Sequence, residues 1–326
     1  MLITRENLEN KQIWIYAVTL IVGGLTGVYL PQFGSSLEVA ISPFIAILLY
    51  TMFAQIPFLE LKKSLSNVKF IIGLLVSNFI VVPIIVWILT MIFPQSPYVL
   101  LGIHLVLLTP CIDYVIVFTK LGRGNEKLML AATPILFVLQ MILLPFYLWL
   151  FMGEDTAQIV KVEPFLEAFL FLIALPLLLA ILTQVWAKRG LKGKGVLQFT
   201  TWLPVPFMAL VLLVVVASQI ENVVSDFQLI LAVVPIYLLF HIFMPIFSKM
   251  VTKLFKLDVG ASRAVVFSSS TRNSLVVLPL ALSLPNEYAV ITAAVIVTQT
   301  IVELVMELFY IKIIPSFVIK EKQPVL

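Results

Sequence analysis

Two polar segments interrupt long apolar runs, and they carry the side chains of this chain that are best suited to bind a ligand. The first, Thr109-Pro110-Cys111-Ile112-Asp113, places a helix-breaking proline, the only cysteine and a carboxylate inside the run Pro97–Thr119. The second, Ser268–Ser274, contains seven consecutive polar residues. Proline removes a backbone donor, and short polar side chains compete for backbone groups. The sequence therefore predicts that the helix unwinds at both segments.

Opposite charges lie within these two segments, Asp113 in the first and Arg272 in the second. A charge near the bilayer centre costs about 2.5–3.5 kcal/mol on insertion scales, so an unpaired charge there is unfavourable. Both residues fall near the middle of their runs, and we expect them to neutralise one another. Two interpretations stay open: a pair that handles substrate or protons, and a buried structural salt bridge.

Other polar residues of the two segments and one acidic residue near the C-terminus complete the candidate site. Cys111 is either a small apolar packing residue or, directly after the mid-span proline, a functional thiol. Glu303 and Glu307 lie one helical turn apart, and we expect Glu303 to face the cavity. The residues expected to contact substrate are Thr109, Cys111, Asn273, Ser274 and Glu303. A single cysteine and two solitary histidines predict neither a metal site nor a cofactor.

The composition is that of a polytopic membrane protein. Hydrophobic residues make up 61% of the 326 residues and charged residues 12%, and the mean hydropathy is +1.12. The net charge of +4 therefore reflects the loops and does not indicate a nucleic-acid partner. Ten runs are long enough to span a bilayer. They are Ile13–Leu30, Leu37–Ile56, Phe70–Phe93, Pro97–Thr119, Leu128–Met152, Pro164–Ala187, Val196–Ile220, Phe227–Met250, Ala261–Leu284 and Tyr288–Ile314.

The distribution of basic residues predicts the orientation of these spans. Of the 21 lysines and arginines, all but Lys161 and Arg272 fall in alternate loops or at the termini. Because cytoplasmic loops carry the excess of basic residues, we expect a multi-pass protein of the cell membrane with both termini in the cytoplasm.

The two halves of the chain share short motifs at a constant offset. Pro43-Phe44-Ile45-Ala46 recurs as Pro206-Phe207-Met208-Ala209, 163 residues later, and the same offset carries Thr109 onto Arg272. Five spans per half would make the second half enter the membrane inverted. We therefore expect an all-α fold of two inverted five-helix repeats, 1–152 and 164–314, joined by the extracellular loop 153–163. Helices four and nine would be broken and would cross at the midplane.

Two interrupted helices at matching places in two repeats indicate the binding site of a secondary transporter. The sequence lacks the zinc-protease, serine-hydrolase and nucleotide-loop motifs, so we do not expect an enzyme or an ATP-driven pump.

These features resemble the bile acid:sodium symporter superfamily. The Pro110-Cys111 pair followed by an apolar run, and Val302-Glu303 in the last span, are similar to its arsenite-efflux permease branch. The resemblance implies that Cys111 is the thiol needed for As(III) transport and Glu303 its acidic partner. Sodium-coupled members carry glutamate and glutamine where this chain has Ser268 and Arg272, so the resemblance also implies no sodium at that site.

Three functions follow as hypotheses. The first is efflux of arsenite or antimonite coupled to protons. The second is transport of a small organic or inorganic anion paired to Arg272. The third is a membrane sensor that binds a ligand without moving it. We find no cytoplasmic output domain in the sequence, which counts against the sensor.

Overall fold

The computed structural model describes residues 5–56, 58, 67–112, 114–153, 167, 170–225 and 227–321. Within them the regular structure is helical and the one β-type contact is an isolated bridge, so the prediction of an all-α fold is confirmed. Six helices there are long and apolar enough to cross a membrane. A seventh span results if the bent pair Leu191–Thr200 and Pro204–Ser218 counts as one. The ten spans and the inverted repeat stay predictions.

Ten spans are predicted from the sequence, whereas six or seven helices are long enough to cross a membrane. The fourth and ninth predicted spans account for part of this difference, because each is divided into two short helices. The fourth consists of α7 (Pro97–Leu107, 11 residues) and α8 (Val115–Leu121, 7 residues). The ninth consists of α16 (Val259–Ser270, 12 residues) and α17 (Ser274–Leu282, 9 residues). None approaches the roughly 20 residues that a single helix needs to cross the hydrocarbon core.

The chain forms two compact units, and each takes segments from both halves of the sequence. Unit 1 comprises Met1–Leu59, Gln158–Ile230 and Leu275–Val297. Its helices are α1 (Arg5–Tyr29), α2 (Pro31–Ser36), α3 (Glu38–Gln55), η3 (Leu170–Ala174), α12 (Leu175–Arg189), α13 (Leu191–Thr200), α14 (Pro204–Ser225), most of α17 and the start of α18 (Asn286–Ile313). This division differs from the predicted repeats, whose boundaries stay a prediction.

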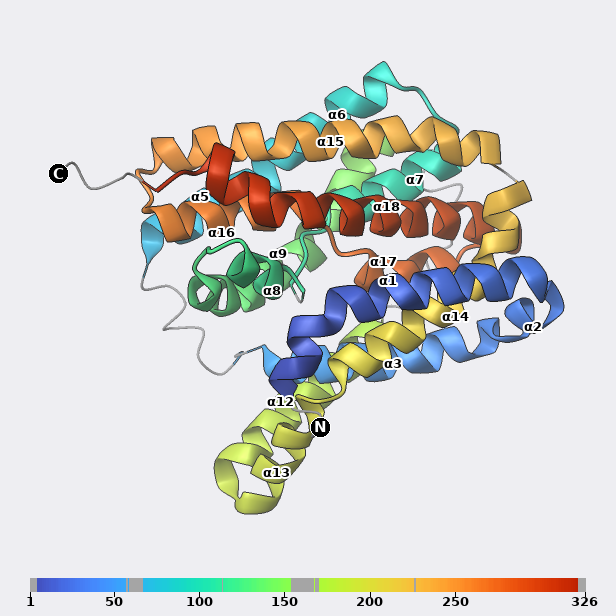
Figure 1. Ribbon diagram of the computed structural model, residues 1–326, viewed down its shortest axis with the longest axis horizontal. Coiled ribbons are helices and arrows are strands. Elements are labelled where there is room, and N and C mark those ends of the chain that lie inside the picture. Colours follow the sequence, from blue (N-terminus) through green and yellow to red (C-terminus); the bar gives the residue numbers. More distant parts are fainter. Residues whose placement is uncertain are drawn as a thin grey trace. The chain divides into compact units, whose positions relative to one another are not determined.

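In unit 1, α1 packs along α14, as the ribbon shows (Figure 1). Small residues allow this close approach, as is common between helices in membranes. A Cβ atom placed on Gly23 would lie 2.9 Å from the carbonyl oxygen of Leu213, whereas one on the adjacent Gly24 would meet nothing within 4 Å. A side chain, Gln184 of α12, closes the end of α3 by donating to the carbonyl oxygens of Phe53, Ala54 and Ile56.

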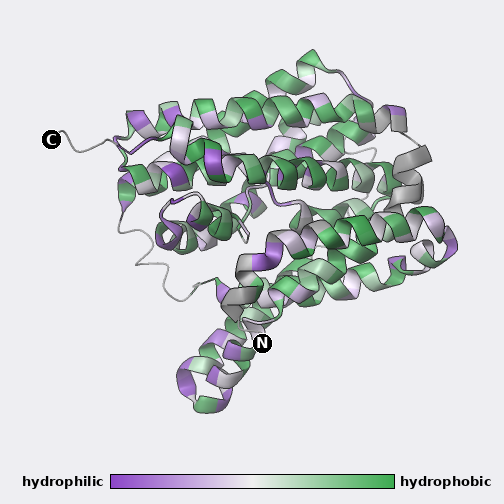
Figure 2. Cartoon of the chain, viewed as in Figure 1, coloured by the Kyte–Doolittle hydropathy of each residue, from purple (hydrophilic) through white to green (hydrophobic). Residues whose placement is uncertain are grey.

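Unit 2 comprises Glu60–Ala157, Leu231–Ser274 and Thr298–Leu326. Its helices are α5 (Val68–Val76), η2 (Ser77–Val81), α6 (Val82–Ile92), α7, α8, α9 (Glu126–Met152), α15 (Phe227–Leu254), α16, the end of α18 and η4 (Ile314–Val318). Hydrophobic residues dominate the long helices and hydrophilic ones concentrate toward helix ends (Figure 2). Hydrogen bonds between Ser248 and Ser269 and between His241 and Tyr310 tie α15 to α16 and to α18.

Side-chain caps fix where three helices of unit 2 begin. The side chain of Asn67 accepts from the amide of Phe70 at the start of α5. The side chain of Asn125 accepts from the amide of Leu128 at the start of α9, and that of Asp258 from the amide of Ala261 at the start of α16. Each cap satisfies one of the four amides that a helix leaves open at its N-terminus. The caps at α9 and α16 meet, because the amide of Asn125 donates to the carbonyl of Gly260 at 3.0 Å.

The two adjacent glycines of α1 provide a matched test of the packing in unit 1. We expect Gly23→Ala to destabilise the protein by about 1–3 kcal/mol, because the new methyl group overlaps backbone atoms of α14. Gly24→Ala should be neutral or slightly stabilising, because alanine favours the helix and has open space. Equal apparent unfolding temperatures of the two purified variants would contradict this packing.

Candidate functional site

The two helix breaks lie side by side in unit 2 and pair through their backbones. The amide of Cys111 donates to the carbonyl of Thr271 at 3.2 Å, and the amide of Asn273 donates to the carbonyl of Thr109 at 2.8 Å. These bonds form an antiparallel bridge between Pro110 and Arg272. All six residues are buried, so the crossing supplies partners for backbone groups that neither broken helix could satisfy alone.

The second break is shorter than the sequence predicts. Helix α16 continues through Ser270, and only Thr271–Asn273 lie outside a helix, so the expected unwinding at Ser268–Ser270 is wrong. Two of these three serine hydroxyls, those of Ser268 and Ser269, make hydrogen bonds while the helix continues. Ser269 donates back to the carbonyl of Val265, and Ser268 accepts from the side-chain amide of Asn78.

Arg272 carries its charge into the interior of unit 2. Its side chain is 0% exposed. One terminal nitrogen donates to the side-chain oxygen of Asn78 at 2.8 Å and to the carbonyl of Ser268 at 2.6 Å, and the other donates to the carbonyl of Leu107 at 3.3 Å. The guanidinium carbon lies 5.7 Å from the ring centroid of Phe240, a cation–π distance.

Glu303 accepts a hydrogen bond from the backbone of Arg272. Its carboxylate accepts from the amide of Arg272 at 2.7 Å, from the hydroxyl of Tyr114 at 2.6 Å and from the side-chain amide of Gln299 at 2.6 Å. The Tyr114 hydroxyl also lies 3.0 Å from the carbonyl oxygen of Arg272. Hydrogen bonds to a charged acceptor are short and about twice as strong as neutral ones, so Glu303 fixes the break to α18 and to α8.

A second acidic residue, Glu307, contacts the break at Thr271, the residue before Arg272. One carboxyl oxygen of Glu307 lies 2.7 Å from the hydroxyl of Thr271, and its other oxygen has no hydrogen-bond partner among the described residues. The two histidines are also buried. His104 packs against the ring of Phe151, with centroids 5.5 Å apart, and His241 pairs with Tyr310.

The structure therefore brings most of the predicted site residues to one place. Thr109, Cys111 and Asn273 lie on the paired breaks, and Glu303 bonds to the break at Arg272. Ser274 is buried, and its hydroxyl has no hydrogen-bond partner within the described part of the chain. Asp113 lies outside the described residues, so its pairing with Arg272 stays a prediction.

Four residues of this site were missed by sequence reasoning, namely Asn78, Tyr114, Phe240 and Gln299. Asn78 carried a usable signal, because it is a polar residue within the apolar run Phe70–Phe93. It lies in the π-helical segment η2, a type of irregularity that is frequent at functional sites. Gln299 also carried one, because it lies four residues before Glu303 and so on the same helix face.

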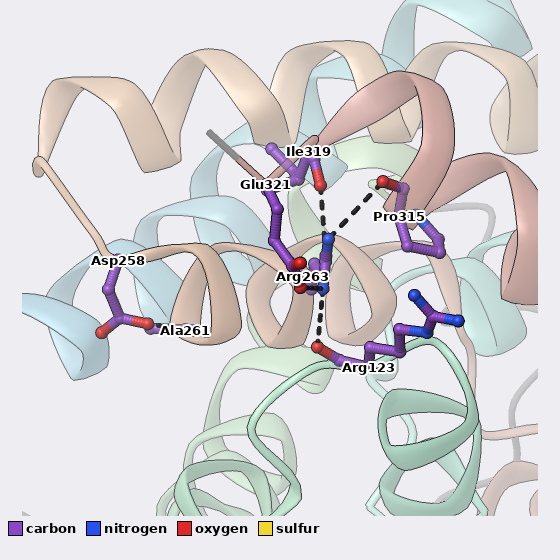
Figure 3. A network of polar contacts seen from close by, with 7 residues as sticks. All are labelled: Arg123, Asp258, Ala261, Arg263, Pro315, Ile319 and Glu321. Carbon is purple, nitrogen blue, oxygen red and sulfur yellow. Dashed lines mark hydrogen bonds and ion pairs between the residues drawn. The ribbon is translucent and has the colours of Figure 1, made fainter. Parts of the chain in front are cut away.

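A separate polar network lies near the beginning of α16, where Arg263 joins three parts of unit 2 (Figure 3). Its guanidinium donates to the carbonyl oxygens of Arg123, Pro315 and Ile319 and pairs with Glu321 at 3.2 Å. The network holds the segment after α18 and the turn after α8 against α16. It thereby fixes the helix that leads into the second break.

The bond between Tyr114 and Glu303 can be tested with a double-mutant cycle. We expect Tyr114→Phe and Glu303→Gln each to lower the free energy of unfolding. We also expect an interaction energy of about 1.5–3 kcal/mol between them, the range for hydrogen bonds to charged groups. The measurement is denaturant unfolding of the purified single and double variants.

Tyr147→Phe is the matched control, because the Tyr147 hydroxyl also makes a 2.6 Å hydrogen bond, but to the carbonyl of Phe79. Its effect should add to that of Glu303→Gln. Additivity in the Tyr114 cycle as well would show that Tyr114 and Glu303 are not coupled.

Comparison with known proteins identifies the family. The model of the Sodium Bile acid symporter family matches residues 18–226, which is more than half of the chain. The match includes the first break and Asn78. The comparison with curated proteins finds no match. Together with the apolar helices, the match shows that the chain belongs to the sodium bile acid symporter family and is a multi-pass membrane transporter for a small molecule or ion, not an enzyme.

Proposed function

We propose that the chain exports arsenite or antimonite in exchange for protons, with both termini in the cytoplasm. The observation that carries the proposal is that Cys111 and Glu303 bind consecutive residues of one break. The Cys111 amide donates to the carbonyl of Thr271, and Glu303 accepts from the amide of Arg272. These are the two residues that the resemblance to arsenite permeases assigns to the metalloid and to its acidic partner.

The bonds of Glu303 suggest how a proton would act on the crossing. Its carboxylate accepts from three donors, on Arg272, Tyr114 and Gln299. A proton on either oxygen would occupy one of about four accepting lone pairs and cancel the negative charge, so the hydrogen bonds from these donors would weaken. Proton binding would thus loosen the hold of α18 on the break, which couples the proton to a change in the site.

The alternative is a small anion paired to Arg272. The positive charge at the crossing and the unpartnered Nε of this side chain, among the described residues, favour it. Against it, both terminal nitrogens of the guanidinium already donate to protein oxygens. We therefore place the metalloid first and use the anion as the competing outcome of the test.

Cys111→Ser is the direct test of the metalloid hypothesis. A thiolate is a soft ligand and a hydroxyl is not, and the chain has no other cysteine. We expect uptake of arsenite into everted vesicles to fall at least about tenfold, the effect of losing about 1.4 kcal/mol of binding. Thr133→Ser, on α9, changes no thiol and lies outside the two breaks, so it serves as the control.

Membrane insertion of the cysteine variant is checked by its yield. Unchanged arsenite uptake by a well-inserted Cys111→Ser protein, together with saturable uptake of an organic acid, would move the assignment to the anion.

The coupling ion gives a second test. A guanidinium holds its positive charge permanently, and a metal cation 4 Å away would be repelled by about 4 kcal/mol at an effective dielectric near 20. We expect arsenite transport in proteoliposomes with a pH gradient to continue when choline replaces sodium. Collapse of the pH gradient with a proton ionophore should abolish it. Loss of transport in choline while the gradient persists would contradict proton coupling.

A further inference from the structure

An apolar groove lies between α15 and the π-helical segment η2 in unit 2. Its volume is about 360 Å³, and it is lined by Val81 of η2 and by Phe247, Met250, Val251 and Leu254 of α15. The four residues of α15 are spaced as i, i+3, i+4 and i+7, so they form one face of that helix. Met250 and Leu254 are 61% and 75% exposed, and the groove is therefore open along its length.

Basic residues lie at the end of the groove that Leu254 marks. Leu254 is the last residue of α15 and of its membrane span. Lys253 and Lys256 lie directly before and shortly after it, and both are exposed. Because the span ends at this point, the two ammonium groups fall at the level of the lipid head groups.

The other wall of the groove contributes a third lysine at the same end. A Cβ atom placed on Gly73 of α5 would lie 3.3 Å from the side chain of Leu257, so the start of α5 meets the chain just after α15. Lys69 lies one helical turn before Gly73, is exposed and stands near the start of the span Val68–Ile92. Two spans thus bring three lysines to one end of an apolar groove.

We propose that this groove binds an anionic phospholipid, with an acyl chain along the apolar residues and the phosphate beside Lys69, Lys253 and Lys256. The apolar lining suits a hydrocarbon chain. The lysines favour a head group with net negative charge over phosphatidylcholine, whose phosphate is neutralised by its own choline. The site depends neither on the cargo of the transporter nor on the orientation of the chain in the membrane.

The bound lipid would stabilise the second helix break, because the two walls of the groove also support that break. Asn78 of η2 accepts from the guanidinium of Arg272, and Ser248 of α15 hydrogen-bonds to Ser269 of α16. Asn78 and Ser248 are both buried. A lipid that fills the space between η2 and α15 would therefore hold together the two elements that contact the break from this side.

The competing explanation is that any lipid fills the groove and that the lysines only mark the ends of the spans. The experiment measures lipid binding to the purified protein in detergent by native mass spectrometry, together with the apparent unfolding temperature. We expect phosphatidylglycerol to bind at least about tenfold more tightly than phosphatidylcholine. Phosphatidylglycerol should also raise the unfolding temperature by about 3 °C. Inorganic phosphate should not raise it, since it lacks the acyl chain.

Charge is tested by the double variant Lys253→Gln/Lys256→Gln. It should weaken the binding of phosphatidylglycerol about fivefold per lysine and leave that of phosphatidylcholine unchanged. Lys188→Gln/Lys192→Gln is the matched control, because it removes the same charge from two exposed lysines of unit 1. The control should bind both lipids as the natural protein does.

The groove is tested by Val81→Phe, which fills space there without changing any charge. It should remove the preference for phosphatidylglycerol, whereas Val39→Phe, at an exposed position of α3, should not. Should Val81→Phe not accumulate, Met250→Trp at an exposed position of the groove replaces it. Four results would each overturn the proposal: equal affinity for the two lipids, no stabilisation by phosphatidylglycerol, an equal loss in the lysine control, or an unchanged preference in the groove variant.

Discussion

The need to pair buried backbone groups is the constraint on which unit 2 depends. Two helices stop within the protein, and the residues at their ends are buried, so their backbone groups need partners from the protein. The structure resolves this with a short antiparallel bridge between Pro110 and Arg272. The other contacts of the site surround this bridge. Glu303 and Tyr114 hydrogen-bond to the backbone of Arg272, and the Arg272 side chain donates to the carbonyl oxygens of Leu107 and Ser268.

Much of this arrangement was predictable from local sequence. Pro110 marks the first break within one apolar run, and the polar residues Ser268–Ser274 mark the second break within another. The inverted relation between the two halves of the chain predicted that the two breaks meet. The length of the second break was not predictable, because Ser268 and Ser269 are stabilised in the helix partly by residues far away in sequence, Asn78 and Ser248. The partners of Arg272 were hidden for the same reason, since two of them are 165 and 194 residues away.

The charge balance of the site also differs from the simplest expectation. A buried arginine suggests a carboxylate partner, yet the guanidinium contacts of Arg272 among the described residues are to neutral oxygens and to the Phe240 ring. The nearby carboxylate, Glu303, binds the backbone of Arg272 instead. Helix ends and amide dipoles can stabilise a cation without a counter-ion, provided that they are fixed in place. The caps and the Arg263 network provide that rigidity.

The bridge between the breaks has a consequence for how this protein family can evolve. Its hydrogen bonds use the amides of Cys111 and Asn273 and the carbonyls of Thr271 and Thr109, and every residue except proline offers the same two groups. Side chains at these positions can therefore be exchanged while the crossing persists. Selection for a new cargo could act on the chemistry displayed there without first rebuilding the scaffold, and a single architecture could diversify across substrates as unlike as a metalloid and a steroid acid.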